Sequence, residues 1–382
     1  MFFFLWIFAI IVCFVITLFP IRVEDSINKQ KDVLFFVEKF VEYLLIACTY
    51  VLIVSNRTQP DIINYQYGYI GAISLDSSRE ILYKFLSSTS YNIGLNFFQF
   101  RNVLVLLSGV CFIFAMKMAN VKISSVLLFY LPVVMFMDSS QFRNSICLYV
   151  LLLAVHLLND SKNFIFFIVV VLILSQIHSA YIVYLILLGL FLRDQKRKYF
   201  LCGIFGVSLI VCALTFMNGN RVPFVNDFFA FFLSSSDERV LYALSTGRFG
   251  FLYPLGVHSI TLVLLLFLKG RTCLANRDDF FVKCMIGLMT CSYVIVPFIM
   301  MNMNYYRIIR NAYVASLIAF MVIYREQKND VLGKIMLLGG LAMVTGLWGF
   351  FEMGIYDSID VIANPILKDG VWFLDNETGV LR

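Results

Sequence analysis

Residues 1–20 read MFFFLWIFAIIVCFVITLFP, an apolar run that contains one hydroxyl side chain, Thr17, and no charged residue. A helix of about 20 apolar residues is long enough to cross the hydrocarbon core of a bilayer. Similar runs recur along the chain, which is 61% hydrophobic and only 14% charged. The runs are continuous rather than alternating, which excludes a β-barrel. We therefore expect an all-α, polytopic integral membrane protein, a bundle of about twelve transmembrane helices.

The predicted spans are separated by charged and polar segments. The first run has no basic residues before it and no small-residue cleavage site, so we expect a span rather than a removable signal peptide. In the segment 163–192, Gln176 and His178 interrupt an apolar stretch, so this segment is either two full spans or a re-entrant element. We expect spans near residues 2–20, 35–54, 102–116, 123–137, 144–158, 163–177, 178–192, 199–216, 250–268, 280–300, 306–324 and 331–351.

Basic residues predict which side of the membrane each loop faces, because short cytoplasmic loops are rich in Lys and Arg. Every second loop, starting after the first span, carries such residues. The opposite side has long segments at about 55–101 and 217–249 and an acidic tail at about 352–382. Both termini then face outward, and we expect residues 1–382 to form one transmembrane domain. The basic residues of the cytoplasmic loops are Arg22, Lys29, Lys31, Lys117, Lys122, Lys162, Arg193, Lys196, Arg197, Lys198, Lys269, Arg271, Arg277, Arg325, Lys328 and Lys334.

Several classes of function lose support because their motifs are missing from the sequence. The nine cysteines and three histidines have no metal-ligand spacing, and no Walker, GxSxG or HExxH motif occurs. The basic residues are scattered at helix ends rather than gathered in one patch, so we expect no nucleic-acid partner. We also expect no metal and no cofactor. A transporter with inverted repeats is disfavoured, because the two halves of the chain share no paired features.

Two outward blocks place polar residues at the ends of predicted spans, where charges are often functional. Arg143, in DSSQFRNSICLYV, opens a span, and its guanidinium could bind a diphosphate oxygen or simply anchor that helix. His178, in SQIHSAY, lies at an outward turn, where an imidazole could exchange a proton with a substrate or be purely structural. We expect His156 to be structural, and the role of His258 stays open.

Three further arginines are candidates for binding the same kind of anion. Arg307 and Arg310, in NMNYYRIIRN, would share one face of a helix that starts on the outward side. Two cations on one face repel each other unless an anion lies between them, and a lipid diphosphate or a nearby carboxylate would supply it. Arg248, in STGRFGF, opens another span and is a weaker candidate of the same kind.

The first outward segment begins with a carboxylate followed by tyrosines. Asp61, in PDIINYQYGYIGA, could be a general base, or it could only stabilise the start of a helix. Tyr65, Tyr67 and Tyr69 could stack on sugar rings, or they could form part of an aromatic belt at the membrane surface.

Five blocks follow one another between about residues 60 and 320: PDIINYQYGYIGAI, YNIGLNFFQFRNVLVLLSGVCFIFAM, QFRNSICLYVLLLAVHLLNDSKNFIFF, SQIHSAYIVYLILL and NYYRIIRNAYVA. In this order they resemble the EpsG-like family of exopolysaccharide and O-antigen polymerases, the Wzy type. The Arg143 block, followed about 35 residues later by the His178 block, is the most specific part of the resemblance.

The resemblance implies an inverting glycosyl transfer between two polyprenyl-diphosphate-linked oligosaccharides, on the outer or periplasmic face of a bacterial inner membrane. The four outward arginines would bind the diphosphate, His178 or Asp61 would be the base, and the three tyrosines would bind sugar. Such a protein is compatible with the architecture of GT-C membrane glycosyltransferases. Its partners would be membrane lipid, a chain-length regulator and a flippase. The alternatives are a lipid-linked oligosaccharide flippase or other transporter, and an O-antigen-ligase-like transferase.

Overall fold

The computed structural model describes residues 1–18, 28–71, 80–156, 163–223, 249–327, 331–356 and 359–372. Within these ranges every regular element is a helix and there is no strand, which confirms the all-α prediction. The chain forms two compact units, and the prediction of one transmembrane domain stays a prediction. The first unit comprises Met1–Leu157, Ile165–Tyr184 and Gly349–Arg382, and the second comprises Leu158–Phe164 and Leu185–Trp348.

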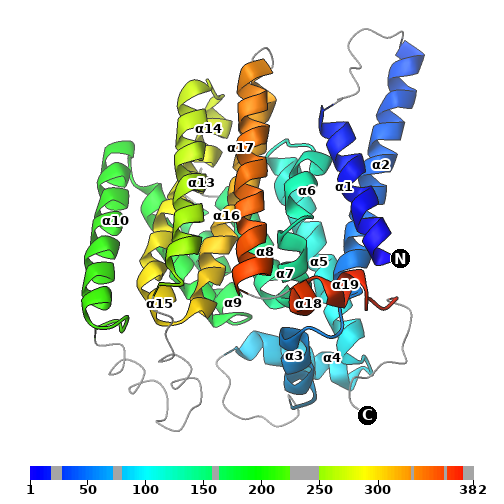
Figure 1. Ribbon diagram of the computed structural model, residues 1–382, viewed down its shortest axis with the longest axis horizontal. Coiled ribbons are helices and arrows are strands. Elements are labelled where there is room, and N and C mark those ends of the chain that lie inside the picture. The colour runs from blue at the N-terminus through cyan, green and yellow to red at the C-terminus, as the bar shows by residue number, and fades with distance from the viewer. Residues whose placement is uncertain are drawn as a thin grey trace. The chain divides into compact units, whose positions relative to one another are not determined.

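The first unit is built on helices that run alongside one another (Figure 1). α1 packs on α2 and α6, and α5 packs extensively on α8, where the rings of Phe112 and Tyr149 stack with centroids 4.4 Å apart. Besides four short helices that are described below, the helices of this unit are α1 (Phe2–Leu18), α2 (Asn28–Val54), α5 (Phe97–Met118), α6 (Ile123–Tyr130), α7 (Val134–Ser140), α8 (Phe142–Val155), most of α9 (Phe164–Ser175), the first part of the 3₁₀ helix η3 (Ser179–Phe191) and the π-helix η6 (Phe351–Tyr356).

The segment predicted as a long outward loop at about 55–101 contains two short helices, α3 (Pro60–Gly71) and α4 (Ile81–Asn92). Pro60 can open α3 because its missing N–H would have no partner inside the helix. Both helices contact α5, and they lie beyond the ends of α2 and α5 (Figure 1). Much of this outward segment is therefore ordered structure rather than loop.

The C-terminal segment 359–372, which contains α18 (Ile359–Ile362) and α19 (Asn364–Leu367), holds the connection between α2 and α3. The backbone N–H of Val371 donates to the carbonyl of Ser55 at 3.0 Å. The side-chain amide of Gln59 donates to the carbonyl of Ile362 at 2.6 Å. These bonds fix the place where α3 begins.

A buried arginine caps the end of α2. The side chain of Arg101, on α5, has no exposed surface, and its guanidinium donates to the carbonyl of Ile53 at 2.8 Å and to that of Asn56. The last carbonyls of a helix lack partners within the helix, and a cation there also interacts favourably with the helix dipole. Asn96 forms a capping box with Gln99 at the start of α5. The end of α2 and the start of α5 are thus both capped by side chains.

The predicted span 123–137 is not one straight helix. It forms α6 and α7, which meet at an angle of 80° across residues 131–133. Pro132 lies in this break, and proline interrupts a helix because it lacks a backbone donor and clashes with the preceding turn. The segment 163–192, in which we expected a possible break, forms α9 and η3, joined at residues 176–178.

The second unit is built around α16 (Arg307–Glu326), in which 16 residues from Ile308 to Ile323 are all buried. α16 packs on α13 and α14. The other elements of this unit are α10 (Asp194–Met217), α13 (Leu252–Arg271), α14 (Asn276–Cys291), η4 (Ser292–Ile295), α15 (Val296–Met301), η5 (Met303–Tyr306) and most of α17 (Val331–Phe350).

Polar side chains inside the second unit connect its helices. The buried ring of His258, on α13, has its Nε2 atom 2.9 Å from the carbonyl of Met289 and 3.1 Å from the hydroxyl of Ser292. His258 therefore has a structural role that its sequence context did not reveal. At the other end of α14, Asp278 pairs with Arg325, which brings two of the predicted cytoplasmic loops to the same end of the unit.

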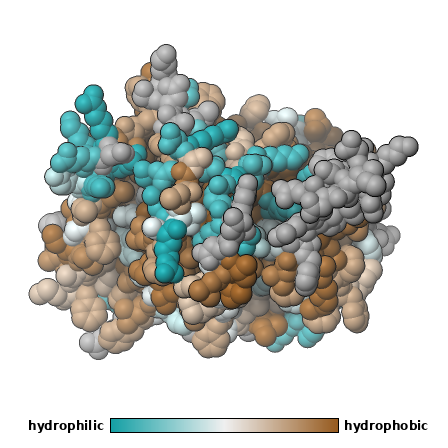
Figure 2. Space-filling model, turned by 90° about the horizontal axis from the view of Figure 1, so that it is seen from above, coloured by the Kyte–Doolittle hydropathy of each residue, from teal (hydrophilic) through white to brown (hydrophobic). Residues whose placement is uncertain are grey.

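Six helices among the described residues are long and apolar enough to cross a membrane, or seven if α6 and α7 count as one span. Four more helices, α1, α8, α9 and η3, are apolar but shorter. Figure 2 looks onto the helix ends and shows hydrophobic residues along the left and lower sides of the view, with hydrophilic residues gathered at its upper left and centre. The protein is thus a membrane protein, while the count of about twelve spans and the GT-C architecture stay predictions.

Replacing Gly370 by alanine is expected to lower stability by about 1–3 kcal/mol, because overpacking forces neighbouring atoms apart. A Cβ atom at this position would lie 2.4 Å from the carbonyl oxygen of Ile366 and 2.7 Å from the ring of Phe2. The measurement is thermal unfolding of the protein purified in detergent.

The matched control is Gly68→Ala on α3, where a Cβ atom would have no neighbour within 4 Å. Its stability should stay the same or rise by up to about 1 kcal/mol, since alanine favours a helix. Equal effects of the two substitutions would contradict the described packing of the C-terminal segment.

Candidate functional site

The site forms around Arg143, the second residue of α8. Its Nη1 atom donates to Oε2 of Glu80, and each of these two side chains is only 17% exposed. The guanidinium carbon lies 4.6 Å from the ring centroid of Tyr65, on α3, and 4.6 Å from that of Tyr83, on α4. A cation between two aromatic rings is held in place by attraction to their faces. The guanidinium is thus oriented by two rings and neutralised by one carboxylate.

Glu80 joins α4 to the turn after α9. Its second oxygen, Oε1, accepts the backbone N–H of Ser179 at 3.0 Å. Glu80 is the N-cap residue of α4, yet its side chain makes no capping hydrogen bond to that helix. The backbone N–H of Tyr83 donates to the carbonyl of Gln176 at 3.2 Å. The start of α4 is therefore tied to residues 176–179 at two points.

The beginning of α8 is bound to the same turn. The hydroxyl of Tyr181 lies 2.7 Å from the carbonyl of Asn144 and donates there, with the side-chain oxygen of Asn144 at 3.1 Å. The half-buried His178 ring lies with its centroid 5.8 Å from that of Tyr181. The structure thus brings together the Arg143 block and the His178 block, which are the most specific part of the sequence resemblance.

The charge balance of the site follows from these contacts. Burial raises the pKa of the Tyr83 phenol well above its usual value, although the neighbouring Arg143 acts in the opposite direction. Tyr83 is therefore neutral near pH 7. The negative charge that balances Arg143 comes from Glu80. Glu80 balances the charge of Arg143 through a bond to Nη1, and an anion that replaced Glu80 would gain that donor.

Of the three predicted sugar-binding tyrosines, Tyr67 points away from the other two, because residues two apart on a helix are about 200° apart around its axis, whereas residues four apart share a face. Tyr65 faces Arg143, and Tyr67 is 57% exposed. Tyr69 is buried, its ring stacks on Phe100 at 5.3 Å, and its hydroxyl donates to the carbonyl of Leu95 at 2.8 Å.

Asp61 lies in the first turn of α3, four residues before Tyr65. Residues four apart share a face of a helix, so Asp61 lies one turn along the face that carries Tyr65. A carboxylate in a first turn also stabilises the helix through its dipole. Both interpretations of Asp61 that the sequence allowed are therefore compatible with its position.

Two of the other predicted arginines belong to the second unit. Arg307 and Arg310 open α16 in the second unit, and Arg310 is buried, with its guanidinium carbon 5.8 Å from the ring centroid of Tyr306. Arg248 lies outside the described residues. The part of the site that the structure describes is thus built from Arg143 and its neighbours.

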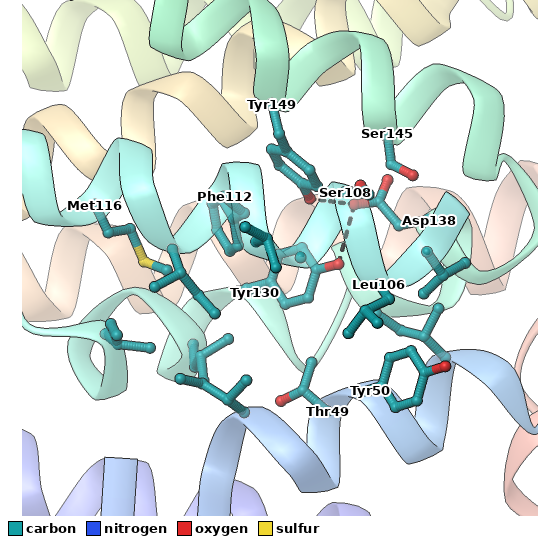
Figure 3. A pocket seen from close by; sticks show the side chains of 18 residues that line it. Thr49, Tyr50, Leu106, Ser108, Phe112, Met116, Tyr130, Asp138, Ser145 and Tyr149 are labelled. Carbon is teal, nitrogen blue, oxygen red and sulfur yellow. Dashed lines mark hydrogen bonds between the residues drawn. The ribbon is translucent and has the colours of Figure 1, made fainter. Parts of the chain in front are cut away.

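A second polar cluster lies close by in the same unit. Asp138, at the end of α7, accepts the hydroxyl of Tyr130 at 3.0 Å and that of Tyr149. These side chains line a cavity of about 180 Å³ whose other walls come from α2 and α5 (Figure 3). The walls are mainly apolar, with hydroxyl groups of Thr49 and Ser108 among them.

Two residues of the site, Glu80 and Tyr83, were not predicted from the sequence. Glu80 is separated from Arg143 by 63 residues, and no spacing rule connects two residues so far apart. One signal was present, since Glu80 is a single carboxylate that directly precedes the run ILYKFLSSTS. In the folded protein the turn at 176–179 lies beside Glu80, and no local sequence pattern indicates this neighbour.

The helices and the buried arginine–carboxylate pair define a polytopic membrane protein with a charged site at the end of one of its apolar helices. The model of the EpsG family matches residues 40–352, and the chain belongs to that family. This confirms the predicted family and makes the protein a membrane protein of the polysaccharide-polymerase type. No curated protein and no solved structure matches the chain.

Loss of either charge in the pair should destabilise the protein, because the remaining charge is left mostly buried without its partner. We expect Arg143→Ala and Glu80→Ala each to cost about 3 kcal/mol, and the double variant to cost less than their sum by about 1–3 kcal/mol. A double-mutant cycle of unfolding free energies measures this coupling.

The control cycle uses Lys122 and Glu38, which pair at 2.5 Å but leave the lysine 42% exposed. Their coupling should stay below about 1 kcal/mol, as is usual for exposed ion pairs. Additive effects at Arg143 and Glu80 would show that the two charges are not coupled in solution.

Proposed function

We propose that the protein is a polysaccharide polymerase that joins polyprenyl-diphosphate-linked oligosaccharide repeat units on the outer or periplasmic face of a bacterial inner membrane. The observation that carries this proposal is the environment of Arg143. A mostly buried guanidinium at the end of an apolar helix is oriented by Tyr65 and Tyr83 and balanced by a single carboxylate. Membership of the EpsG family supports the class of reaction.

The chemistry of the leaving group explains why an arginine is suited to this reaction. Breaking the bond between a sugar and a lipid diphosphate leaves negative charge on the phosphate oxygens. A guanidinium presents a planar fork of donors that can bind two of these oxygens at once. Because water is largely excluded around Arg143, its attraction for that charge is stronger than at an exposed surface.

The reaction is a single displacement at the anomeric carbon. The hydroxyl at the non-reducing end of the incoming repeat unit attacks this carbon, and the bond to the diphosphate breaks with inversion of configuration. A base must take the proton of the hydroxyl, and His178 and Asp61 are the candidates from the sequence. The exposed ring of Tyr67 could stack on a sugar, while Arg248, Arg307 and Arg310 stay candidates for further phosphate contacts.

The test is incubation of the purified protein with a polyprenyl-diphosphate-linked repeat unit, followed by separation of the products on a glycan ladder gel. The wild type should form a ladder, and Arg143→Ala should reduce it by roughly 100-fold or more, as expected when a group that stabilises developing charge is lost. Arg143→Lys keeps the charge but loses the planar fork, so it should retain the fold and still lose most of the activity.

The control is Lys122→Ala, which removes a cation on the predicted cytoplasmic side and should leave the ladder unchanged. Gel filtration of each variant checks that the protein remains folded. If the wild type leaves the substrate unextended but moves it across the bilayer of a liposome, the result would contradict the polymerase function and support the flippase function. Transfer of glycan only to a different acceptor would indicate the ligase.

A further inference from the structure

The carboxylate of Glu80 occupies the place at Arg143 that the proposed function assigns to the substrate. We propose that Glu80 is the proton acceptor of the reaction, held on Arg143 in the resting protein and released when the diphosphate of the donor takes its place. This proposal rests on the proposed function, and it names a catalytic residue that the sequence did not indicate.

The contacts of Glu80 suit a group that changes partners. Oε2 accepts from Arg143 and Oε1 accepts from the backbone N–H of Ser179 at 3.0 Å. Although Glu80 stands at the N-cap of α4, its side chain does not cap that helix. The carboxylate is therefore turned toward the site instead of serving its own helix. Release from Arg143 would leave α4 with the same hydrogen bonds as before.

The charges favour an exchange of anions at Arg143. The carboxylate of Glu80 carries one negative charge, whereas a diphosphate carries more than one and can place two oxygens on the guanidinium fork. Tyr65 and Tyr83 hold the cation in place, with each ring centroid 4.6 Å from the guanidinium carbon. The arginine can thus keep its position while its anionic partner changes.

The exchange would free an oxygen of Glu80 to accept a proton. Oε2, which accepts from Arg143 in the resting protein, would then face the site without a partner. The bond to the N–H of Ser179 keeps the released carboxylate beside the turn that carries His178. Donor binding and activation of the acceptor would therefore be coupled through one ion pair.

In the chemical step one bond to the anomeric carbon forms and another breaks. The oxygen of the acceptor hydroxyl forms a bond to the anomeric carbon, and its proton passes to Glu80. The bond between that carbon and the diphosphate oxygen breaks, and its electron pair leaves with the diphosphate on Arg143. After the lipid diphosphate departs, Glu80 passes its proton to water and returns to the arginine.

The test separates binding from turnover, using farnesyl diphosphate as a short-chain probe for binding and the ladder gel for turnover. Glu80→Gln keeps the shape of the side chain and removes its charge. We expect turnover to fall by roughly 100-fold or more, the usual contribution of a general base. The probe should bind tighter by about fivefold or more, because no carboxylate competes for Arg143.

Glu80→Asp serves as a second variant that retains the charge. Its shorter side chain should leave binding of the probe close to that of the wild type while lowering turnover by about tenfold or more. The matched control is Glu38→Gln, which neutralises the carboxylate paired with Lys122 at 2.5 Å. This control should change neither binding nor turnover.

A Glu80→Gln variant that extends glycan at the wild-type rate would overturn the role of Glu80 as proton acceptor. Weaker binding of the probe by this variant would overturn the exchange, because it would mean that Glu80 only positions Arg143. In both cases a wild-type ladder would leave the proposed function standing. Absence of a wild-type ladder would overturn the proposed function and this proposal together.

Discussion

The interaction between Arg143 and Glu80 constrains the first unit more than any other single contact that we describe. A guanidinium that is 17% exposed at the end of an apolar helix needs an anion beside it, since an unpaired charge there is costly. Glu80 can supply that anion only if α4 begins beside α8 and beside the turn at 176–179. The ion pair thus determines where three segments, far apart in the sequence, must meet.

Arg101, which is buried, and Arg143, which is mostly buried, show two ways of stabilising such a charge. Arg101 is surrounded by backbone, and its partners are the carbonyls of Ile53 and Asn56 at the end of α2. Those carbonyls cannot move away without opening the helix end, so Arg101 is a structural residue. The partner of Arg143 is a side chain, which can rotate without disturbing a helix. This difference is the physical reason to place the chemistry at Arg143.

Much of the fold could be predicted from the sequence, because the membrane requires each span to be an apolar run of about 20 residues. The spans near 35–54 and 102–116 fall within α2 and α5, and the span near 306–324 matches α16 except for its first residue. The bend between α6 and α7 was missed because hydropathy does not register the effect of Pro132 on a helix. In the segment at about 55–101, a helix start at Asp61 was one of the interpretations that the sequence allowed, whereas α4 was missed because it is short and mixed in composition.

The candidate site was predicted in part. Arg143 and His178 stand at the ends of apolar runs, where a polar residue is conspicuous, and the structure brings their blocks together. Glu80 and Tyr83 lie in a segment that mixes polar, charged and aromatic residues, so neither residue differs from its sequence neighbours. Only the tertiary packing of α4 against the turn at 176–179 gives them a partner. Pairing across such distances is not encoded in local patterns.

The central claim is that a lipid diphosphate takes the place of Glu80 at Arg143. The most direct measurement is a cryo-electron microscopy structure of the protein with a short-chain isoprenyl diphosphate bound. We predict phosphate oxygens within hydrogen-bonding distance of the Arg143 guanidinium, still between Tyr65 and Tyr83, and the Glu80 carboxylate turned away. An intact pair of Arg143 and Glu80, with the diphosphate bound elsewhere, would contradict the claim.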